Sequence, residues 1–451
     1  MGAGRETGVH RESTEEVPTM FSDNSRKTGA MSRRDFARAA ALGVPAAATC
    51  SAWARQKAAP LPPTPATADE KYWSAVREQF VLAPDLIALN AANLCPSSRP
   101  ALDALFDHTR DVDRDPSFNN RARMTAGKET TRKLLASYLR VTPEEIIITR
   151  NTSEANNLVS SGIDLKAGDE VIIFSDNHPS NHQAWTEKTK RFGFTVRTVE
   201  QVNPHPGAEF YIQAFTRAMT PQTRVLAFTH LTNTVGDLFP ARELCRISRE
   251  RGVLTLVDGA QSLGLMDVDL GDMQPDFYTG SAHKWPCGPK ECGVLYINKA
   301  AQSRIWPSIY SAYTGAAGIS RTFEGFGQRD EPAIISFGEA VKFFDGIGRA
   351  AIEKRARELA QALMEGLRKM DGVKIWTHAD PARSVAVVSF QPGGLDTRKL
   401  SAALYEKDRI ACATRGGADR GGLRFSPHLY NSHAEIERTL AAVKRYLSTG
   451  V

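Results

Sequence analysis

Lys284 is the first residue in this sequence whose type and surroundings suggest chemistry. It follows Gly280-Ser281-Ala282-His283, at the end of the short run 276–279, and precedes Trp285. A lysine in a loop at the end of a strand, among such neighbours, is partly desolvated, which lowers its pKa and favours the nucleophilic amine. Taken alone, the pattern is more typical of a solvated surface lysine, so its interpretation depends on what lies beside it.

Two further segments place polar side chains directly after apolar runs. Asp258 follows the run 253–257, where a carboxylate could bind a metal or a sugar, or pair with a ring nitrogen. Thr152 and Ser153 follow the run 145–149, at the start of a predicted helix. Their hydroxyls could hold a phosphate together with the backbone N–H groups, although helix capping without a ligand is the commoner role.

The elements that must position these residues alternate along the chain between helical periodicity and short β-branched runs. Helices are predicted in 128–139, 153–163, 181–191, 241–251 and 333–344, and strands in 145–149, 170–174, 223–228, 253–257, 276–279 and 293–297. Near-continuous apolar strands separated by helices predict an α/β fold with a mostly parallel sheet covered on both faces. Such sheets bind ligands at the carboxyl ends of their strands, where the three candidate segments lie.

The chain after residue 330 has a different pattern. Two long helices are followed by segments 385–390, 395–406, 423–425 and 432–447, a sequence of elements that predicts a smaller α+β domain. We therefore expect an N-terminal arm and large domain over 71–330 and a small C-terminal domain over 331–451.

Five motifs, in order, resemble the class V aminotransferase family of pyridoxal-phosphate enzymes, which includes cysteine desulfurases and isopenicillin N epimerase-like proteins. They are 149–156, 178–185, 230–236, 258–261 and 281–284, and the similarity extends from about residue 86 to the C-terminus. The resemblance implies the fold type I of these enzymes, with a seven-stranded, mostly parallel sheet and a smaller α+β domain. It also implies pyridoxal 5'-phosphate as the cofactor and no metal, and it suggests a homodimer.

The resemblance assigns roles to individual residues. Lys284 would carry the cofactor covalently and move the proton at the substrate Cα, Asp258 would pair with the pyridine nitrogen, and His178 would stack on the ring. Arg415 would bind the substrate carboxylate, with Arg424 as a nearby alternative. The remaining implied cofactor contacts are Thr152, Ser153, Asn233, Gln261, Ser281 and His283.

Two departures from the family pattern indicate which branch of the family this sequence resembles. Cysteine desulfurases need a cysteine in a mobile loop, but 415–422 contains none and Cys412 lies before it. Gln328 also stands where relatives usually carry a threonine. The sequence therefore favours the isopenicillin N epimerase-like branch, with transamination or epimerisation of an amino acid or peptide-like amino compound. A carbon–sulfur lyase acting on a cysteine conjugate or sulfoxide is an alternative, as is a non-catalytic binding protein with this fold.

The N-terminal segment predicts export. Ser32-Arg33-Arg34-Asp35-Phe36 precedes an Ala-rich stretch, 39–48, and Ala52-Trp53-Ala54 offers a cleavage site, an order that resembles a twin-arginine signal over 1–54. A Pro- and Ala-rich linker over 55–70 follows it. The twin-arginine machinery carries folded proteins, so we expect a periplasmic protein that acts on a secondary metabolite or siderophore precursor.

Composition excludes several other classes. The balance of 57 Lys+Arg against 51 Asp+Glu, a net charge of +6, is too small and too scattered to indicate a nucleic acid partner. No run approaches the roughly 18 apolar residues of a membrane-spanning helix. The five cysteines beyond Cys50 are predicted to be mostly buried free thiols, because their number is odd and their spacing suits no zinc site.

Overall fold

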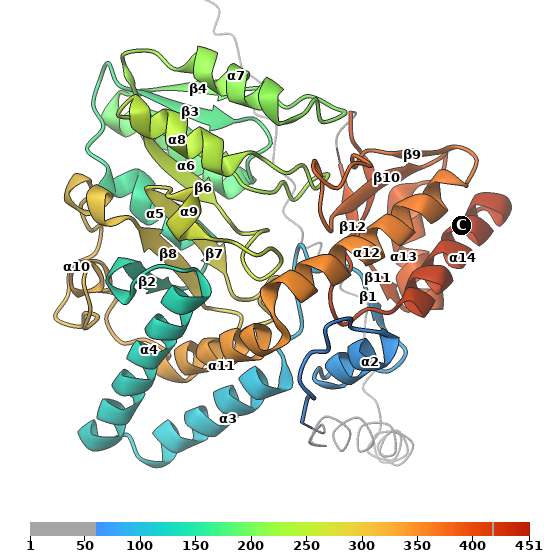
Figure 1. The fold of residues 1–451 in the computed structure, drawn as a ribbon, viewed down its shortest axis with the longest axis horizontal. Helices are drawn as coiled ribbons and strands as arrows, with labels where there is room; N and C mark the ends of the chain where they lie inside the picture. Colours follow the sequence, from blue (N-terminus) through green and yellow to red (C-terminus); the bar gives the residue numbers. More distant parts are fainter. Residues whose placement is uncertain (1–59, 417–418) are drawn as a thin grey trace, which may run out of the picture. The chain divides into compact units, whose positions relative to one another are not determined.

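The computed structural model describes residues 60–416 and 419–451 (Figure 1). The predicted signal, 1–54, and the first part of the predicted linker, 55–59, lie outside the described residues. Among the helices that are described, none combines the length and the apolarity needed to cross a membrane.

A seven-stranded sheet forms the centre of the larger part of the chain. Its strands, in spatial order, are β2 (Ile146–Thr149), β8 (Gly293–Ile297), β7 (Phe277–Ser281), β6 (Leu254–Asp258), β5 (Thr223–Thr229), β3 (Glu170–Phe174) and β4 (Thr195–Val199). All neighbouring pairs are parallel except those of β8, which is antiparallel to β2 and to β7. The predicted mostly parallel sheet is therefore confirmed, and strands 170–174 and 293–297 have the predicted bounds.

Alternate residues of these strands enter two separate cores. Ile146 and Ile148 of β2 pack with the core that includes α4 (Phe118–Tyr138), α7 (Ala208–Ala218) and α8 (Ala241–Glu250). Ile147 packs on the opposite side, with α5 (Thr152–Gly162) and α6 (Pro179–Phe192). Because both faces are covered, the strands are apolar on both sides, as their continuous runs predicted.

Helix α4 begins ten residues before the predicted helix 128–139. The hydroxyl of Ser117 caps it by accepting a hydrogen bond from the N–H of Asn120 at 3.3 Å. Residues 118–127 lack the apolar period that indicates a helix, so the sequence alone did not predict this first part. Helices α3 (Arg99–Arg114) and α11 (Glu331–Ile347) pack against each other, and α11 also packs against α4 (Figure 1).

The C-terminal part contains a second, antiparallel sheet of four strands. Their order is β12 (Ala413–Arg415), β13 (Gly422–Phe425), β10 (Val388–Pro392) and β9 (Val373–Ile375). Helices α12 (Arg349–Arg368), α13 (Thr397–Asp408) and α14 (His433–Thr449) contribute to the core beside this sheet. Strands β12 and β13 matter for the site, because they carry the two candidate substrate arginines.

The remaining elements are short or lie before the large sheet. They are α2 (Glu70–Glu78), β1 (Ile87–Ala88), the 3-10 helices η1 (Pro143–Glu145) and η2 (Lys299–Arg304), α9 (Leu270–Met273), α10 (Ser320–Phe323) and β11 (Ile410–Ala411). Strand β1 pairs with β11 in parallel and so ties the N-terminal arm to the C-terminal part.

Candidate active site

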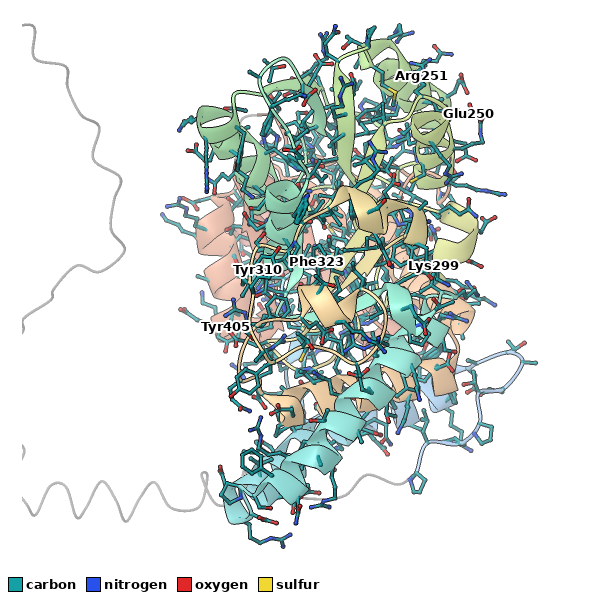
Figure 2. All side chains as sticks on the ribbon, turned by 90° about the vertical axis from the view of Figure 1, so that its left-hand side faces the viewer. Glu250, Arg251, Lys299, Tyr310, Phe323 and Tyr405 are labelled. Carbon is teal, nitrogen blue, oxygen red and sulfur yellow. The ribbon has the colours of Figure 1, made fainter. Side chains whose placement is uncertain are left out.

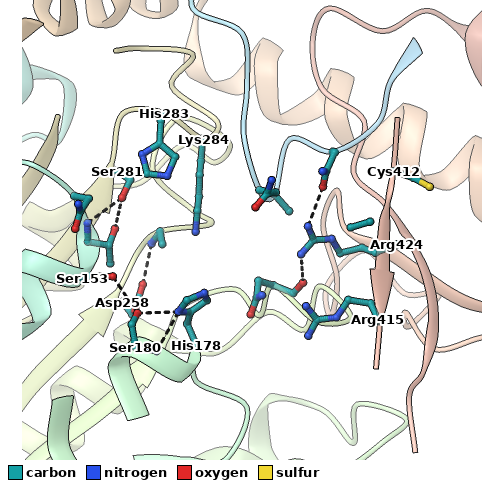
Figure 3. A pocket seen from close by; sticks show the side chains of 18 of the residues that line it. Ser153, His178, Ser180, Asp258, Ser281, His283, Lys284, Cys412, Arg415 and Arg424 are labelled. Atoms are coloured by element: carbon teal, nitrogen blue, oxygen red, sulfur yellow. Dashed lines mark hydrogen bonds between the residues drawn. The ribbon is translucent and has the colours of Figure 1, made fainter. Parts of the chain in front are cut away.

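A cavity of about 700 Å³ lies at the edge of the large sheet where β2, β3, β5, β6 and β7 end (Figure 3). All the sequence-predicted site residues except Gln261 line it, namely Thr152, Ser153, His178, Asn233, Asp258, Ser281, His283, Lys284 and Arg415. The large sheet contributes most of the wall, and β12 and β13 of the second sheet close the other side. The parallel strands bring together the predicted residues from Thr152 to Lys284, and Arg415 comes from the second sheet.

Asp258 ends β6 and is held in place by three hydrogen bonds. Its Oδ2 accepts from the side-chain amides of Asn156, at 3.0 Å, and Asn181, at 3.2 Å. Its Oδ1 accepts from the backbone N–H of Ala260 at 3.1 Å. The residue is only 2% exposed, so these hydrogen bonds fix the direction in which the carboxylate faces. Asp258 can therefore present a fixed negative charge to a cationic group in the cavity.

Lys284 follows β7 and points into the same space as Asp258 and His178 (Figure 3). Burial lowers the pKa of its ammonium group below the ordinary value, and the positive charge of Arg424 acts in the same direction. The carboxylate of Asp258 opposes this shift. The net effect increases the fraction of neutral amine, the form that attacks a carbonyl or accepts a proton.

His178 lies between β3 and α6, and its ring orientation is fixed by Ser180. The backbone N–H of Ser180 donates to Nδ1 at 3.3 Å, and the Ser180 hydroxyl lies 2.8 Å from the same atom. Because Nδ1 accepts a hydrogen bond, the proton of the neutral ring is on Nε2. Burial lowers the pKa of His178, and the positive charges of Lys284, Arg415 and Arg424 lower it further. The ring is therefore a neutral group with one free N–H.

Hydroxyl groups gather at the N-terminus of α5. The Ser281 hydroxyl accepts from the Thr152 N–H at 2.9 Å and lies 2.7 Å from the Thr152 hydroxyl. The Ser153 hydroxyl donates to Ser180 at 3.1 Å. Burial lowers the pKa of the neighbouring His283 to about 4, so that its ring is neutral. Hydroxyls beside unpaired helix N–H groups form a suitable site for a phosphate.

Two arginines close the opposite side of the cavity. Arg424 donates to the carbonyl of Asn233 at 2.7 Å and to Oδ1 of Asn90 at 3.0 Å, and it is only 3% exposed. Arg415 is half-buried and has no hydrogen-bond or ion-pair partner among the described residues. Of the two, Arg415 is therefore the guanidinium group that is free to bind a ligand.

Gln261 is placed differently from the other predicted cofactor contacts. Its Nε2 donates to the carbonyl of Ala92 at 3.0 Å, and its Oε1 accepts from the indole N–H of Trp285 at 2.7 Å. Gln261 does not belong to the lining of the cavity. In this structure its amide links the segment after β6 to Ala92, which lines the cavity, and to Trp285, which does not.

Several functional side chains were not singled out from the sequence. Asn156 and Asn181 orient Asp258, and Ser180 orients His178, so each acts through a predicted residue. Asn156 lies within the 149–156 motif, and Ser180 and Asn181 lie within the 178–185 motif, so the signal was present. Asn90 and Asn93 also line the cavity, but they lie far from any motif and have no such signal.

Cys412 lines the cavity near Ser401, whose hydroxyl lies 3.6 Å from the sulfur. Burial raises the pKa of the Cys412 thiol to about 11. The thiolate is the nucleophilic form, so this cysteine is poorly suited to accept sulfur at neutral pH.

The residues present fit pyridoxal 5'-phosphate. Asp258 could face a protonated ring nitrogen, Lys284 could bind the aldehyde carbon, and the Thr152–Ser281 hydroxyl group could hold the phosphate. Two buried polar atoms, Oδ1 of Asn181 and Nδ1 of His283, have no hydrogen-bond partner among the described residues. Buried groups of this kind are normally paired, which indicates that this region is built to receive a polar ligand.

Comparison with known proteins gives matches over most of the chain. The family model "Aminotransferase class-V" matches residues 105–439. The isopenicillin N epimerase of Amycolatopsis lactamdurans is 33% identical over 390 residues, covering 82% of this chain and 98% of that protein. A probable cysteine desulfurase of Methanothermobacter thermautotrophicus is 27% identical over 389 residues, covering 80% and 95%.

A solved structure shows the same fold. The C-DES mutant with glycine covalently linked to its pyridoxal-phosphate cofactor matches with a TM-score of 0.76 and 24% identity. The match covers 84% of this chain and 99% of that one. The chain therefore has the fold of the pyridoxal-phosphate enzymes of fold type I.

Proposed function

Because the chain belongs to the aminotransferase class-V family of pyridoxal-phosphate enzymes, we propose that it breaks the Cα–H bond of an amino acid or peptide-like amino compound. Transamination or epimerisation then follows. The observation that carries this proposal is the arrangement of Lys284, Asp258 and the unpartnered Arg415 around one cavity. When bound, pyridoxal phosphate withdraws electrons from the substrate Cα and so acidifies its proton.

Lys284 is the residue that moves the proton in this proposal. Its lowered pKa keeps a fraction of the amine neutral, so Nζ can accept the proton from Cα and return it. The fixed carboxylate of Asp258 would hold a proton on the ring nitrogen of the cofactor. The guanidinium of Arg415 orients the substrate by its carboxylate, since a planar fork of donors matches that group.

The role of His178 distinguishes transamination from epimerisation, and two observations point in opposite directions. Ser180 fixes the neutral ring with its proton on Nε2, and a neutral imidazole N–H donates a hydrogen bond far more readily than a proton. This favours an orienting role, with Lys284 as the only proton carrier. Similarity to isopenicillin N epimerase over nearly the whole of that protein favours epimerisation, which needs proton delivery on the other face.

The proposal includes export to the periplasm through the twin-arginine pathway. Its support is the Arg33-Arg34 signal pattern in the sequence, together with a cofactor that a folded protein could carry across the membrane. Central nitrogen metabolism is cytoplasmic, so an exported enzyme of this kind suits the tailoring of a secondary metabolite or siderophore precursor.

The proposal also includes a homodimer. Residues 306–313 expose three aromatic side chains, Trp306, Tyr310 and Tyr313, at 68%, 69% and 58% (Figure 2 labels Tyr310). Ile309 of this segment lines a cavity of about 270 Å³ together with Phe326 and Gln328. Exposed apolar clusters mark interaction surfaces, so a second subunit could cover this region. Sedimentation of the loaded enzyme as a monomer would contradict this part of the proposal.

Deuterium exchange tests the central proposal. The purified, cofactor-loaded protein is incubated in D₂O with a panel of L- and D-amino compounds, and the products are identified by mass spectrometry and chiral chromatography. We expect deuterium at Cα of at least one compound, together with either the inverted isomer or a keto acid. Release of pyruvate from a cysteine conjugate would instead favour the carbon–sulfur lyase alternative, and absence of any exchange would contradict the proposal.

His178→Phe separates the outcomes. If the ring only stacks and orients, as we expect, exchange at Cα stays within about tenfold of the unchanged protein, since a phenyl ring preserves the stacking. If His178 delivers a proton, the inverted isomer disappears while exchange persists.

A further inference from the structure

A second cluster of reactive side chains lies behind the lysine loop, which we define as residues 281–287. It consists of Cys95, Cys287 and His428, whose candidate ligand atoms all lie within 4.8 Å of one another. Each of the three residues is at most 1% exposed. None of them lines the cofactor cavity, so the cluster is separate from the site described above.

The ring of His428 has one nitrogen engaged and one free. Nε2 lies 2.8 Å from the carbonyl oxygen of Trp285, so Nε2 carries the proton and donates it. Nδ1 is buried and has no hydrogen-bond partner among the described residues. A histidine that binds a metal typically donates its other N–H to a backbone carbonyl, which is the arrangement found here. A buried lone pair without a partner otherwise destabilises the fold.

Cys287 has an unusual backbone conformation. Its φ is +51°, in the left-handed region that residues with a side chain rarely adopt. Such conformations persist where the surrounding structure holds them, and they cluster at functional sites. Here the left-handed turn accompanies a buried thiol that lies beside Cys95.

We propose that Cys95, Cys287 and His428 bind a thiophilic d¹⁰ metal ion, Zn²⁺ or Cu⁺, through two thiolates and Nδ1. With metal–sulfur bonds of about 2.3 Å and metal–nitrogen bonds of about 2.0 Å, three ligand atoms arranged in a plane around one ion lie roughly 4 Å apart. The ligand atoms of the cluster lie within 4.8 Å of one another, so small shifts bring them to that spacing. Soft thiolate ligands select these ions over hard cations.

The charges in the cluster are consistent with such an ion. Binding releases one proton from each thiol, so Zn²⁺ with two thiolates and a neutral imidazole forms a neutral unit, and Cu⁺ leaves a charge of −1. The ammonium group of Lys290, which donates to the Cys95 carbonyl at 3.0 Å, lies close enough to compensate part of that charge. A buried ion is tolerated only when its charge is matched in this way.

The metal would fix the position of Lys284 through the backbone. The N–H of Cys95 donates to the carbonyl of His283 at 2.9 Å, and the N–H of Cys287 donates to the carbonyl of Lys284 at 3.0 Å. Since His428 holds the carbonyl of Trp285, the three ligand residues hold three consecutive carbonyls of the lysine loop. The ion would therefore act as a structural clamp on this loop.

Metal content of the loaded enzyme tests the proposal. The protein is purified without chelators, and samples are exposed to Zn²⁺ or, under reducing conditions, to Cu⁺ before gel filtration and elemental analysis. We expect about one ion per chain from one of the two arms. X-ray absorption should then show two sulfur neighbours and one nitrogen neighbour at about the distances given above.

Substitutions locate the ion. Cys95→Ser and His428→Gln should each reduce metal affinity at least tenfold, whereas Cys292→Ser, another fully buried cysteine close in sequence, should retain it. If a variant fails to fold, X-ray absorption of the unchanged protein still decides the question. Absence of bound metal in both arms would overturn the proposal, as would a Cys95–Cys287 disulfide found by peptide mass spectrometry in the native protein.

Discussion

The lysine loop has one side that lines the cavity and another side that packs in the core. Ser281, His283 and Lys284 line the cavity, and the ring of His283 keeps a nitrogen without a partner. Trp285 and Cys287 are fully buried and pack in the core. The core side fixes the backbone, so the cavity side can leave polar groups unpaired for a ligand. Positioning and chemistry are thus assigned to neighbouring residues of one short segment.

Lys284→Ala tests the cavity side and should have the largest effect. Without the amine, the protein cannot bind pyridoxal phosphate covalently, so borohydride reduction followed by peptide mapping should find no cofactor on the chain. Activity should fall below detection, because the residue also moves the proton. Thermal unfolding of the cofactor-free protein should change little, since the core side is intact.

The matched control is Lys299→Ala, at an exposed lysine of η2 (Figure 2). It should retain the cofactor and the full rate of exchange at Cα. Cofactor attached to another lysine in the Lys284→Ala protein would contradict the assignment.

Asp258→Asn tests the same side with a smaller change. The new asparagine keeps the shape of the carboxylate but has no charge. If its NH₂ group takes the place of Oδ2, it faces the NH₂ donors of Asn156 and Asn181 and cannot accept their hydrogen bonds. We expect the rate of Cα exchange to fall by about 10²–10³, the range typical of a lost electrostatic contact at a reacting group. Exchange kinetics with equal cofactor loading measure this.

Asn181→Ala serves as its control, because it removes one hydrogen bond and leaves the carboxylate in place. Its effect should be clearly smaller than that of Asp258→Asn. Equal losses in the two variants would mean that the geometry of this side matters more than the charge at 258.

The two sides also differ in how far the sequence predicts them. Asp258, Lys284, Thr152 and Ser153 follow apolar strand runs, so the expected parallel sheet already placed them at one edge, and the family resemblance added their roles. The cluster of Cys95, Cys287 and His428 has no local motif, because its members come from distant segments that meet only in the folded chain. The cysteine spacing accordingly indicated no zinc site.

Two features of the structure could not be read from the sequence. Gln261 follows the same strand as Asp258, but its position after a strand does not determine which way its amide points. Its two polar atoms are used by Ala92 and Trp285. The start of α4 depends on the cap at Ser117, a single hydrogen bond that precedes any apolar period.

Trp285→Phe tests the core side. A phenyl ring fills most of the indole space but leaves Oε1 of Gln261 without its donor at 2.7 Å. A buried acceptor left unpaired lowers the free energy of unfolding by about 1–3 kcal/mol. Denaturant unfolding should show this loss, while the exchange rate per loaded chain stays within about threefold because the ring does not touch the cavity.

Trp306→Phe is the matched control, since Trp306 is 68% exposed. It should leave the free energy of unfolding of the single chain nearly unchanged. If Trp285→Phe abolished exchange without destabilising the fold, the division between a positioning side and a chemical side would be wrong.

Arg424→Gln should have the smallest effect, a change in pH dependence. The Arg424 charge lowers the pKa of Lys284, so its removal raises that pKa toward the ordinary value. Only the neutral amine of Lys284 captures the cofactor. At a fixed pH below the pKa of Lys284, a higher pKa therefore lowers the fraction of neutral amine and slows capture. The rate at which the cofactor-free protein captures pyridoxal phosphate is measured against pH. The midpoint of this curve should move upward by less than about one pH unit, so the rate at a fixed lower pH should fall by up to about tenfold.

Arg415→Gln is the matched control for this measurement. Arg415 lines the same cavity, but it is not among the charges that shift the pKa of Lys284. Its removal should therefore leave the capture midpoint in place and instead raise the substrate concentration needed for half-maximal exchange. Equal midpoint shifts in both variants would show that the total charge of the cavity, rather than the charge of Arg424 alone, sets the pKa of Lys284. The two arginines would then share one role instead of dividing cofactor capture from substrate binding.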